Sequence, residues 1–183
     1  MRTNVDEDAL MLADGSKVAI RAIRADDGPM LQAFVRRLSA GSRRYRFFST
    51  LVELSAARLQ RLVNVDRRGA LALVAVAEQS GDTAIVAEAR CVPDRTAWNA
   101  EFAIAVADEF QRQGLGTRLM ERLVAFAART GMQQLYGEIL GDNTGMLAFI
   151  QRLGFRIRAN PVDRNTVIAS VLRPNFRLAR VQP

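Results

Sequence analysis

The chain has 183 residues, of which 49% are hydrophobic and 25% charged, with a formal net charge of +7. This composition is typical of one globular domain and excludes a largely disordered chain. One cysteine and no histidine exclude a disulfide scaffold and argue against a zinc site. No apolar run approaches the roughly 18 residues that span a bilayer, and the first eight residues carry acids rather than an apolar signal-peptide core, so we expect a cytoplasmic protein without a membrane partner.

The first half of the chain begins with a strand and a helix. "KVAIRAIR" (17–24) alternates apolar and charged residues as a half-buried strand does. Asp26 or Asp27 can cap the helix that follows. Its apolar face is formed by Leu31, Phe34, Val35 and Leu38. A polar, arginine-rich segment with aromatic residues (39–49) precedes a helix over 55–63. Strands over 70–77 and 84–92 then suggest a hairpin.

The second half alternates strands and helices. A strand over 100–106 leads into a glycine loop and a helix to about Arg129. A strand over 133–140 and a helix from Asn143 to about Arg152 follow. Two last strands lie over 155–158 and 165–172. We therefore expect the α/β (α+β) class, with a mixed sheet flanked by helices. The predicted domain is 1–183, with a lead over 9–16 and a tail over 173–183.

The glycine loop after residue 106 has the features of an anion site. Free N–H groups at a helix start attract anions, and Gly114 and Gly116 let the backbone approach a ligand closely. The dinucleotide fingerprint fails because Leu119 stands where a third glycine is required. The Walker A pattern fails because no Gly-Lys-Ser/Thr closes the loop.

Two segments together resemble the GNAT N-acetyltransferase superfamily. Gln111-x-x-Gly114-x-Gly116 is similar to its acyl-CoA signature, and "GDNTGMLAFIQRLGF" (141–155) to its second cofactor-side motif, in which an asparagine, here Asn143, opens a helix. The resemblance implies a GNAT fold with a mostly antiparallel sheet, acetyl-CoA as co-substrate and no metal. The residues that it implies for holding the co-substrate are Ile104, Ala105, Val106, Gln111, Arg112, Gln113, Gly114, Leu115, Gly116, Thr117 and Asn143.

Within the family, "LSAGSRRYRFFS" and "AEFAIAVADEFQRQGLG" resemble segments of bacterial protein lysine acetyltransferases. This resemblance implies direct transfer of an acetyl group to a primary amine in a ternary complex, with a protein lysine as the favoured acceptor, by a free-standing catalytic domain. A small-amine acetyltransferase and a non-catalytic acyl-CoA sensor stay open as alternatives, and a homodimer is left open. The basic and aromatic cluster at 43–48 is too short for a nucleic-acid site and matches no such motif, so we expect no nucleic-acid partner.

Amine acetylation needs a base that removes a proton from the acceptor ammonium. Glu101 is the first candidate, because it shares a strand face with Ala103 and Ala105 beside the glycine loop, where desolvation raises a carboxyl pKa. The resembling branch has its catalytic glutamate at the matching position. Glu138, on the next strand, is the second candidate, as a base or as a residue that lines the acceptor site or orders a water.

The general acid is not assigned by the resemblance. Many GNAT enzymes protonate the leaving thiolate with a tyrosine seven residues after the motif asparagine, and Ile150 stands there in this chain. Tyr45, Tyr136 or water stay open as substitutes. Arg112 and Arg118 flank the loop, and either can pair with CoA phosphates. The family also stabilises the oxyanion with a backbone N–H, which here lies near residues 104–106.

Overall fold

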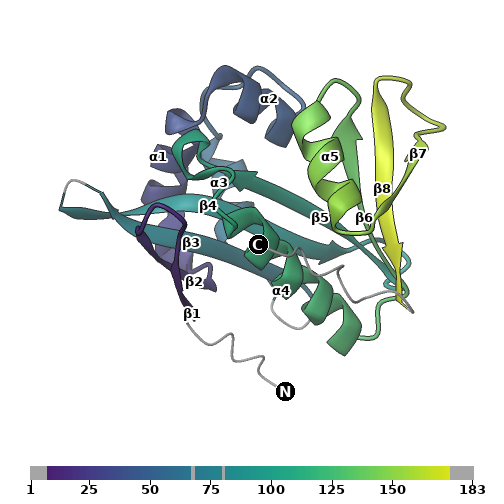
Figure 1. Cartoon of the computed structure of the whole chain (residues 1–183), viewed down its shortest axis with the longest axis horizontal. Helices are drawn as coiled ribbons and strands as arrows, with labels where there is room; N and C mark the ends of the chain where they lie inside the picture. Colours follow the sequence, from purple (N-terminus) through teal and green to yellow (C-terminus); the bar gives the residue numbers. More distant parts are fainter. Residues whose placement is uncertain (1–7, 67–68, 80, 174–183) are drawn as a thin grey trace.

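The computed structural model describes residues 8–66, 69–79 and 81–173 (Figure 1). These residues form one eight-stranded sheet with the order β1-β2-β3-β4-β5-β6-β8-β7. Its strands are β1 (Asp8–Met11), β2 (Lys17–Ala22), β3 (Leu71–Gln79), β4 (Asp82–Pro93), β5 (Asn99–Val106), β6 (Gln134–Leu140), β7 (Arg156–Ala159) and β8 (Thr166–Leu172). Only the β5–β6 pair is parallel, which confirms the predicted mixed, mostly antiparallel sheet.

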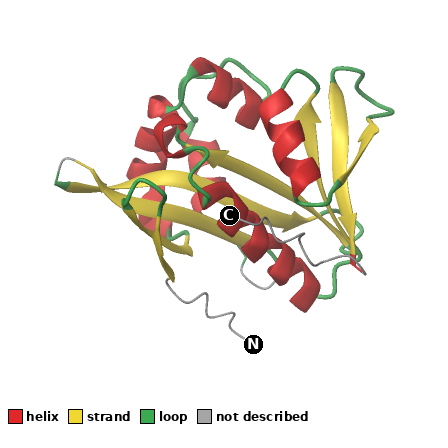
Figure 2. Cartoon of the chain, viewed as in Figure 1, coloured by secondary structure: helices red, strands yellow, loops and turns green. Residues whose placement is uncertain are grey.

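Helices cover both faces of this sheet (Figure 2). They are α1 (Gly28–Arg37), α2 (Ala40–Phe47), α3 (Ala56–Val63), α4 (Leu115–Arg129) and α5 (Thr144–Arg152), with short 3₁₀ turns at Ala25–Asp27 and Asp108–Phe110. The long helix α4 crosses one face with α5 beside it, whereas α1 and α3 lie behind the sheet (Figure 1). In the described part of the chain, no helix has the length and apolar character needed to cross a membrane.

Helix α4 shows why the sequence folds in this way. Its buried residues recur every three or four positions, so one stripe packs on the sheet. Those residues are Leu115, Leu119, Met120, Leu123, Val124, Phe126 and Ala127. Gly131 follows with φ +80, a conformation that glycine adopts without strain, and the chain turns there into β6.

Two elements lie where the sequence analysis predicts none. Strand β1 occupies the start of the expected lead and pairs with β2 at the edge of the sheet. Helix α2 occupies the arginine-rich segment: the side chain of Ser39 caps it by accepting a hydrogen bond from Ser42 N, and Phe47 is its only buried residue. Neither element has a strong hydrophobic period, which is the signal that the sequence analysis uses. Residues 174–183 of the expected tail lie outside the described residues.

The sheet opens where its two halves meet. Strands β5 and β6 pair only over Asn99–Glu101 and Gln134–Tyr136 and then diverge (Figure 1). The ring of Phe102 lies across Gly137 at this point, since a Cβ atom at position 137 would be 2.6 Å from Phe102 Cζ. Phe102 also packs edge-on against Phe155, with 5.5 Å between the ring centroids. Glycine at 137 therefore gives this ring the room that it needs beside the opening.

Candidate active site

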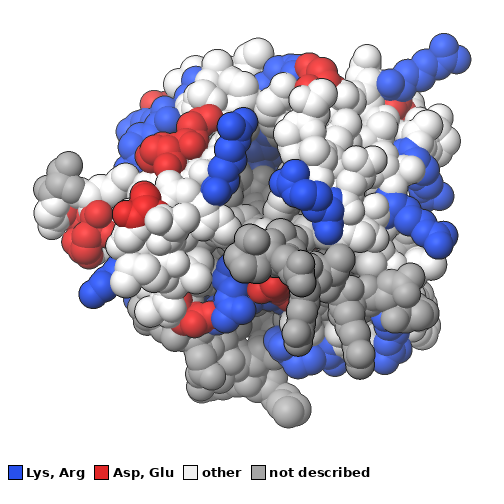
Figure 3. All heavy atoms as spheres, viewed as in Figure 1, with Lys and Arg blue, Asp and Glu red and all other residues white. Residues whose placement is uncertain are grey.

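A cavity of about 1090 Å³ fills the opening between β5 and β6. It is lined by α2, the glycine loop, α5 and both diverging strands, which the fold brings together from distant parts of the chain. Figure 3 shows a hollow in the middle of this face with basic side chains on both of its sides. The predicted site residues that line the cavity are Glu101, Ile104, Ala105, Val106, Gln111, Arg112, Gly114, Gly116, Thr117, Glu138 and Asn143.

The glycine loop presents the start of α4 to this cavity. Gly114 precedes the helix with φ +87, and no side chain caps the helix. The first-turn amides therefore have no intrahelical acceptor, and the helix dipole adds a partial positive charge. Arg118 N is the first to donate inside the helix, to Gly114 O at 3.1 Å. This arrangement fits the pyrophosphate of an acyl-CoA, as it fits other anions.

Some side chains of the predicted co-substrate site also brace the loop. Gln113 Nε2 donates to Glu109 O at 2.9 Å, and Leu115 is fully buried in the core. Gln111 lines the cavity but also donates from Nε2 to Val106 O at 3.0 Å, which ties the loop to the end of β5. Arg112 adopts φ +59, a backbone conformation that is unfavourable for arginine.

The two arginines that flank the loop differ in their surroundings. Arg112 lines the cavity. Arg118 pairs with Asp8 of β1 at 2.8 Å and with Glu121 at 3.4 Å. Of the two arginines, Arg112 is therefore the better candidate to bind a CoA phosphate, because the charge of Arg118 already has two carboxylate partners.

Asn143 combines a structural position with a place in the cavity. Its side-chain oxygen accepts a hydrogen bond from Met146 N at 3.1 Å and so caps α5. The same residue lines the cavity. The role of Asn143 as the cap of α5 and its predicted place in the co-substrate site are therefore compatible.

The backbone of β5 supplies free donors to the opening. Ala107 N donates to Val86 O at 2.8 Å, so the alternation of an antiparallel pair directs the amides of Ala103 and Ala105 toward β4. The amides of Ile104 and Val106 then point the other way, toward the part of β6 that no longer pairs with β5. Of the expected residues 104–106, Ile104 and Val106 thus have their N–H groups on the cavity side.

Glu101 and Glu138 lie on one face of the sheet. Glu101 stands opposite Tyr136 in the parallel register, and Glu138 is two residues further along β6. Glu101 is exposed toward the cavity, but the protein around its carboxyl and the nearby charge of Glu138 raise its pKa, while Arg46 opposes this shift. A carboxylate with a raised pKa beside a cavity is suited to accept a proton near neutral pH.

Glu138 is held by two residues that the sequence analysis missed. Its Oε1 atom accepts hydrogen bonds from Thr166 Oγ1 at 2.6 Å and from Asn160 Nδ2 at 2.9 Å. Thr166 is buried at the start of β8, and Asn160 follows β7. These bonds fix the carboxylate that acts electrostatically on Glu101.

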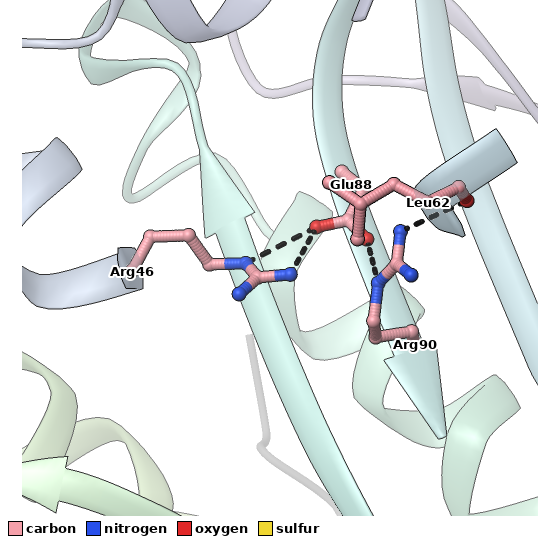
Figure 4. Close-up of polar contacts among 4 residues, drawn as sticks. All are labelled: Arg46, Leu62, Glu88 and Arg90. Carbon is pink, nitrogen blue, oxygen red and sulfur yellow. Dashed lines mark hydrogen bonds and ion pairs between the residues drawn. The ribbon is translucent and has the colours of Figure 1, made fainter. Parts of the chain in front are cut away.

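A buried charge cluster that the sequence analysis also missed lies below α2 (Figure 4). Arg46 of α2 donates to Glu88 Oε2 from Nε at 3.2 Å and from Nη2 at 2.9 Å. Arg90 donates from Nε to the other oxygen, and its Nη2 lies 3.4 Å from Leu62 O of α3. Burial tends to raise the pKa of Glu88, but the two guanidinium groups hold it below its usual value. The cluster fixes Arg46 at the cavity wall.

The tyrosines leave the general acid unassigned. Ile150, at the family's tyrosine position, is fully buried in the core. Tyr45 lines the cavity, with its hydroxyl 3.4 Å from Asp142 O. Burial and the charges of Glu101, Asp94 and Glu138 raise the pKa of Tyr136. The described residues hold no group of three or more His, Cys, Asp or Glu side chains that could bind a metal ion.

Comparison with known proteins identifies the family. Residues 36–155 match the model of the acetyltransferase (GNAT) family. The chain belongs to this family. It is therefore an acetyl-CoA-dependent N-acetyltransferase whose acceptor is an amine.

Its relatives include bacterial acetyltransferases. The chain is 32% identical to an acetyltransferase of Pseudomonas aeruginosa over 86% of its own length and 84% of the relative's. It is 32% identical to acetyltransferase Pat of Mycolicibacterium smegmatis over 60% of its length, but spans only 33% of that larger protein. The crystal structure of the GNAT domain of S. lividans PAT is similar with a TM-score of 0.81 and 26% identity, covering 91% of this chain and 96% of that domain. The chain is thus close to the catalytic domains of protein lysine acetyltransferases.

Proposed function

We propose that this enzyme acetylates a lysine side chain of a protein by direct transfer in a ternary complex, with Glu101 as the general base. The observation that carries the proposal is the position of Glu101. Its side chain faces the cavity, its pKa is raised, and Glu138 of β6 lies on the same face of the sheet. Similarity to the GNAT domain of S. lividans PAT supports a protein acceptor.

In this proposal each part of the site has one task. The loop amides of residues 114–117 and Arg112 hold the pyrophosphate of acetyl-CoA. Glu101 removes a proton from the acceptor ammonium, directly or through a water, and the amine nitrogen then attacks the thioester carbonyl carbon. The free amides of Ile104 and Val106 stabilise the oxyanion. The C–S bond breaks as the C–N bond is completed, and the nitrogen gives up its second proton. The CoA thiolate leaves and takes up a proton, directly or through water, by a route that is not assigned.

Replacement of Glu101 tests the proposed base. We expect Glu101→Gln to lower kcat about 10²- to 10⁴-fold at neutral pH, while calorimetry shows unchanged CoA affinity. Glu109→Gln, an exposed neighbour of the loop, is the matched control. Full turnover by Glu101→Gln would exclude the base, and no turnover by the wild type on any amine would favour an acyl-CoA sensor.

The dependence of activity on pH gives a second test of the pair formed by Glu101 and Glu138. Activity should fall as the pH drops through the raised pKa of Glu101, because the protonated carboxyl cannot accept a proton. Glu138→Gln removes the like charge and should move this acid limb to lower pH.

Incubation of the enzyme with labelled acetyl-CoA and a cell lysate identifies the acceptor. Label confined to small molecules would contradict a protein lysine and indicate a small amine as the acceptor.

A further inference from the structure

The acceptor side of the cavity has two walls of opposite charge. Strand alternation puts Glu101 and Glu138 on the face that also carries Glu88 and Arg90, because these residues are on adjacent, registered strands. Glu88 contacts α2 and Arg90 contacts α3, so this face looks toward those two helices. Carboxylates thus line the sheet wall of the cavity, and the helix wall opposite carries arginines.

Arg58 of α3 is the arginine of this wall whose guanidinium group forms no ion pair within the part of the chain that the structure describes. It lines the cavity and is partly buried, and its guanidinium carbon lies 5.0 Å from the centroid of the Phe47 ring. Arg46, whose guanidinium lies at the same distance from that ring, is bound to Glu88.

The surroundings of Arg58 favour a bound anion. Burial lowers its pKa, and the positive charges of Arg46 and Arg61 lower it further, so an anion beside it would relieve an existing repulsion. The CoA pyrophosphate is not suited to this place, because the glycine loop opens α4, which covers the opposite face of the sheet (Figure 1). The acceptor is then the remaining substrate that can bring an anion to the cavity wall that carries Arg58.

We infer that Arg58 binds a carboxylate that the acceptor carries beside its reactive amine. The ammonium then faces Glu101 and Glu138, and the carboxylate meets the planar fork of Arg58, which can bind it through two hydrogen bonds. An acceptor with only a positive charge satisfies one wall and is repelled by the other. This inference rests on the proposed function and adds to it the acceptor's second charge, which is an acidic side chain next to the target lysine or the α-carboxylate of an amino acid.

Matched acceptors test this inference. One pair is a lysine peptide with glutamate or glutamine next to the lysine; the other is free lysine and lysinamide, which lacks the carboxylate. For the wild type we expect kcat/KM to be about ten- to a hundredfold higher for the carboxylate member of the preferred pair. Binding of the same compounds to the CoA-loaded protein, measured by calorimetry, should show the same preference. Which pair shows it identifies the source of the carboxylate.

Variants on α3 link the preference to Arg58. Arg58→Gln should bring the ratio of kcat/KM between the two members of a pair toward one. Arg58→Lys should retain part of the preference, because a lysine keeps the positive charge but lacks the planar guanidinium group. Arg129→Gln, an exposed charge-matched change at the end of α4 and away from the cavity, should keep the wild-type ratio. Melting temperatures confirm that the variants fold.

The outcomes separate this inference from the proposed function. Equal rates and equal affinities for both members of each pair in the wild type would overturn the inference while leaving lysine acetylation intact. A carboxylate preference that Arg58→Gln retains would also overturn it. A preference in binding without any turnover, abolished by Arg58→Gln, would support the Arg58 site and contradict the proposed reaction.

Discussion

Helices α2 and α4 both border the cavity, but they are attached to the rest of the protein in opposite ways. Seven residues of α4 are buried in an apolar stripe, whereas α2 buries only Phe47. Polar contacts hold α2 on three sides: Asp108 after β5, Asp142 after β6 and Glu88 on β4. The apolar helix α4 thus forms a fixed wall on the acetyl-CoA side of the cavity. The polar helix α2 forms a wall on the amine-acceptor side, and its position depends on charged contacts.

The buried carboxylate below α2 gives the largest expected effect. Glu88→Gln leaves Arg46 and Arg90 without the charge that compensates them in a buried place, so we expect a loss of about 3 to 5 kcal/mol in the free energy of unfolding. Glu53→Gln removes an exposed ion pair with Arg36 and should cost below about 1 kcal/mol in the same denaturation experiment. Equal effects of the two variants would contradict a buried anchor.

The apolar attachment of α4 comes next. Leu119 is fully buried, and Leu119→Ala should lower the free energy of unfolding by about 2 to 5 kcal/mol through lost burial and a cavity. This loss should be insensitive to salt. Val52→Ala, at an exposed position, is the control in the same urea titrations. A strongly salt-dependent loss for Leu119→Ala would break the contrast between the two helices.

The smallest effect is expected at the rim of α2. Asp108 accepts hydrogen bonds from Ser39 N, Ser39 Oγ and Ser42 Oγ, at 3.0, 2.9 and 2.8 Å. Asp108→Asn should cost only about 0.5 to 1 kcal/mol, because solvent screens this exposed carboxylate, but it should raise the KM for the acceptor by loosening α2. Glu109→Gln is the matched control for both measurements.

The same carboxylate gives α2 a pH dependence. Partial burial tends to raise the pKa of Asp108, but the hydrogen bonds from Ser39 and Ser42 outweigh it and lower the pKa below its ordinary value. Its contribution is therefore fully present above about pH 4, the pKa of an unfolded aspartate, and is lost as the pH falls through the lowered pKa. In Asp108→Asn this part of the acid dependence should be missing.

The sequence was sufficient for the parts of the site that local patterns specify. Gly114 has a positive φ before α4, which favours glycine, and Asn143 has a side chain suited to cap α5. Strand alternation together with the family resemblance indicated Glu101. The fold class followed from the hydrophobic periods of the strands and of α4.

The remaining parts depend on pairs that are distant in the chain. Arg118 meets Asp8 across 110 positions, and Thr166 meets Glu138 across 28, so no local spacing indicates either contact. Helix α2 is missed because its attachment is polar and it lacks an apolar period. The close approach of Phe102 to Gly137 is invisible in the sequence, where Gly137 is simply a glycine inside a strand.

The divergence of β5 and β6 also has a consequence for the stability of the enzyme. Two strands that stop pairing leave backbone donors, such as the amides of Ile104 and Val106, without a neighbouring strand. A bound ligand that satisfies them favours only the folded chain, and at a hundred times its dissociation constant it adds about 2.7 kcal/mol to the free energy of unfolding. The concentration of acetyl-CoA in a cell would then contribute to the stability of the folded enzyme as well as to its rate.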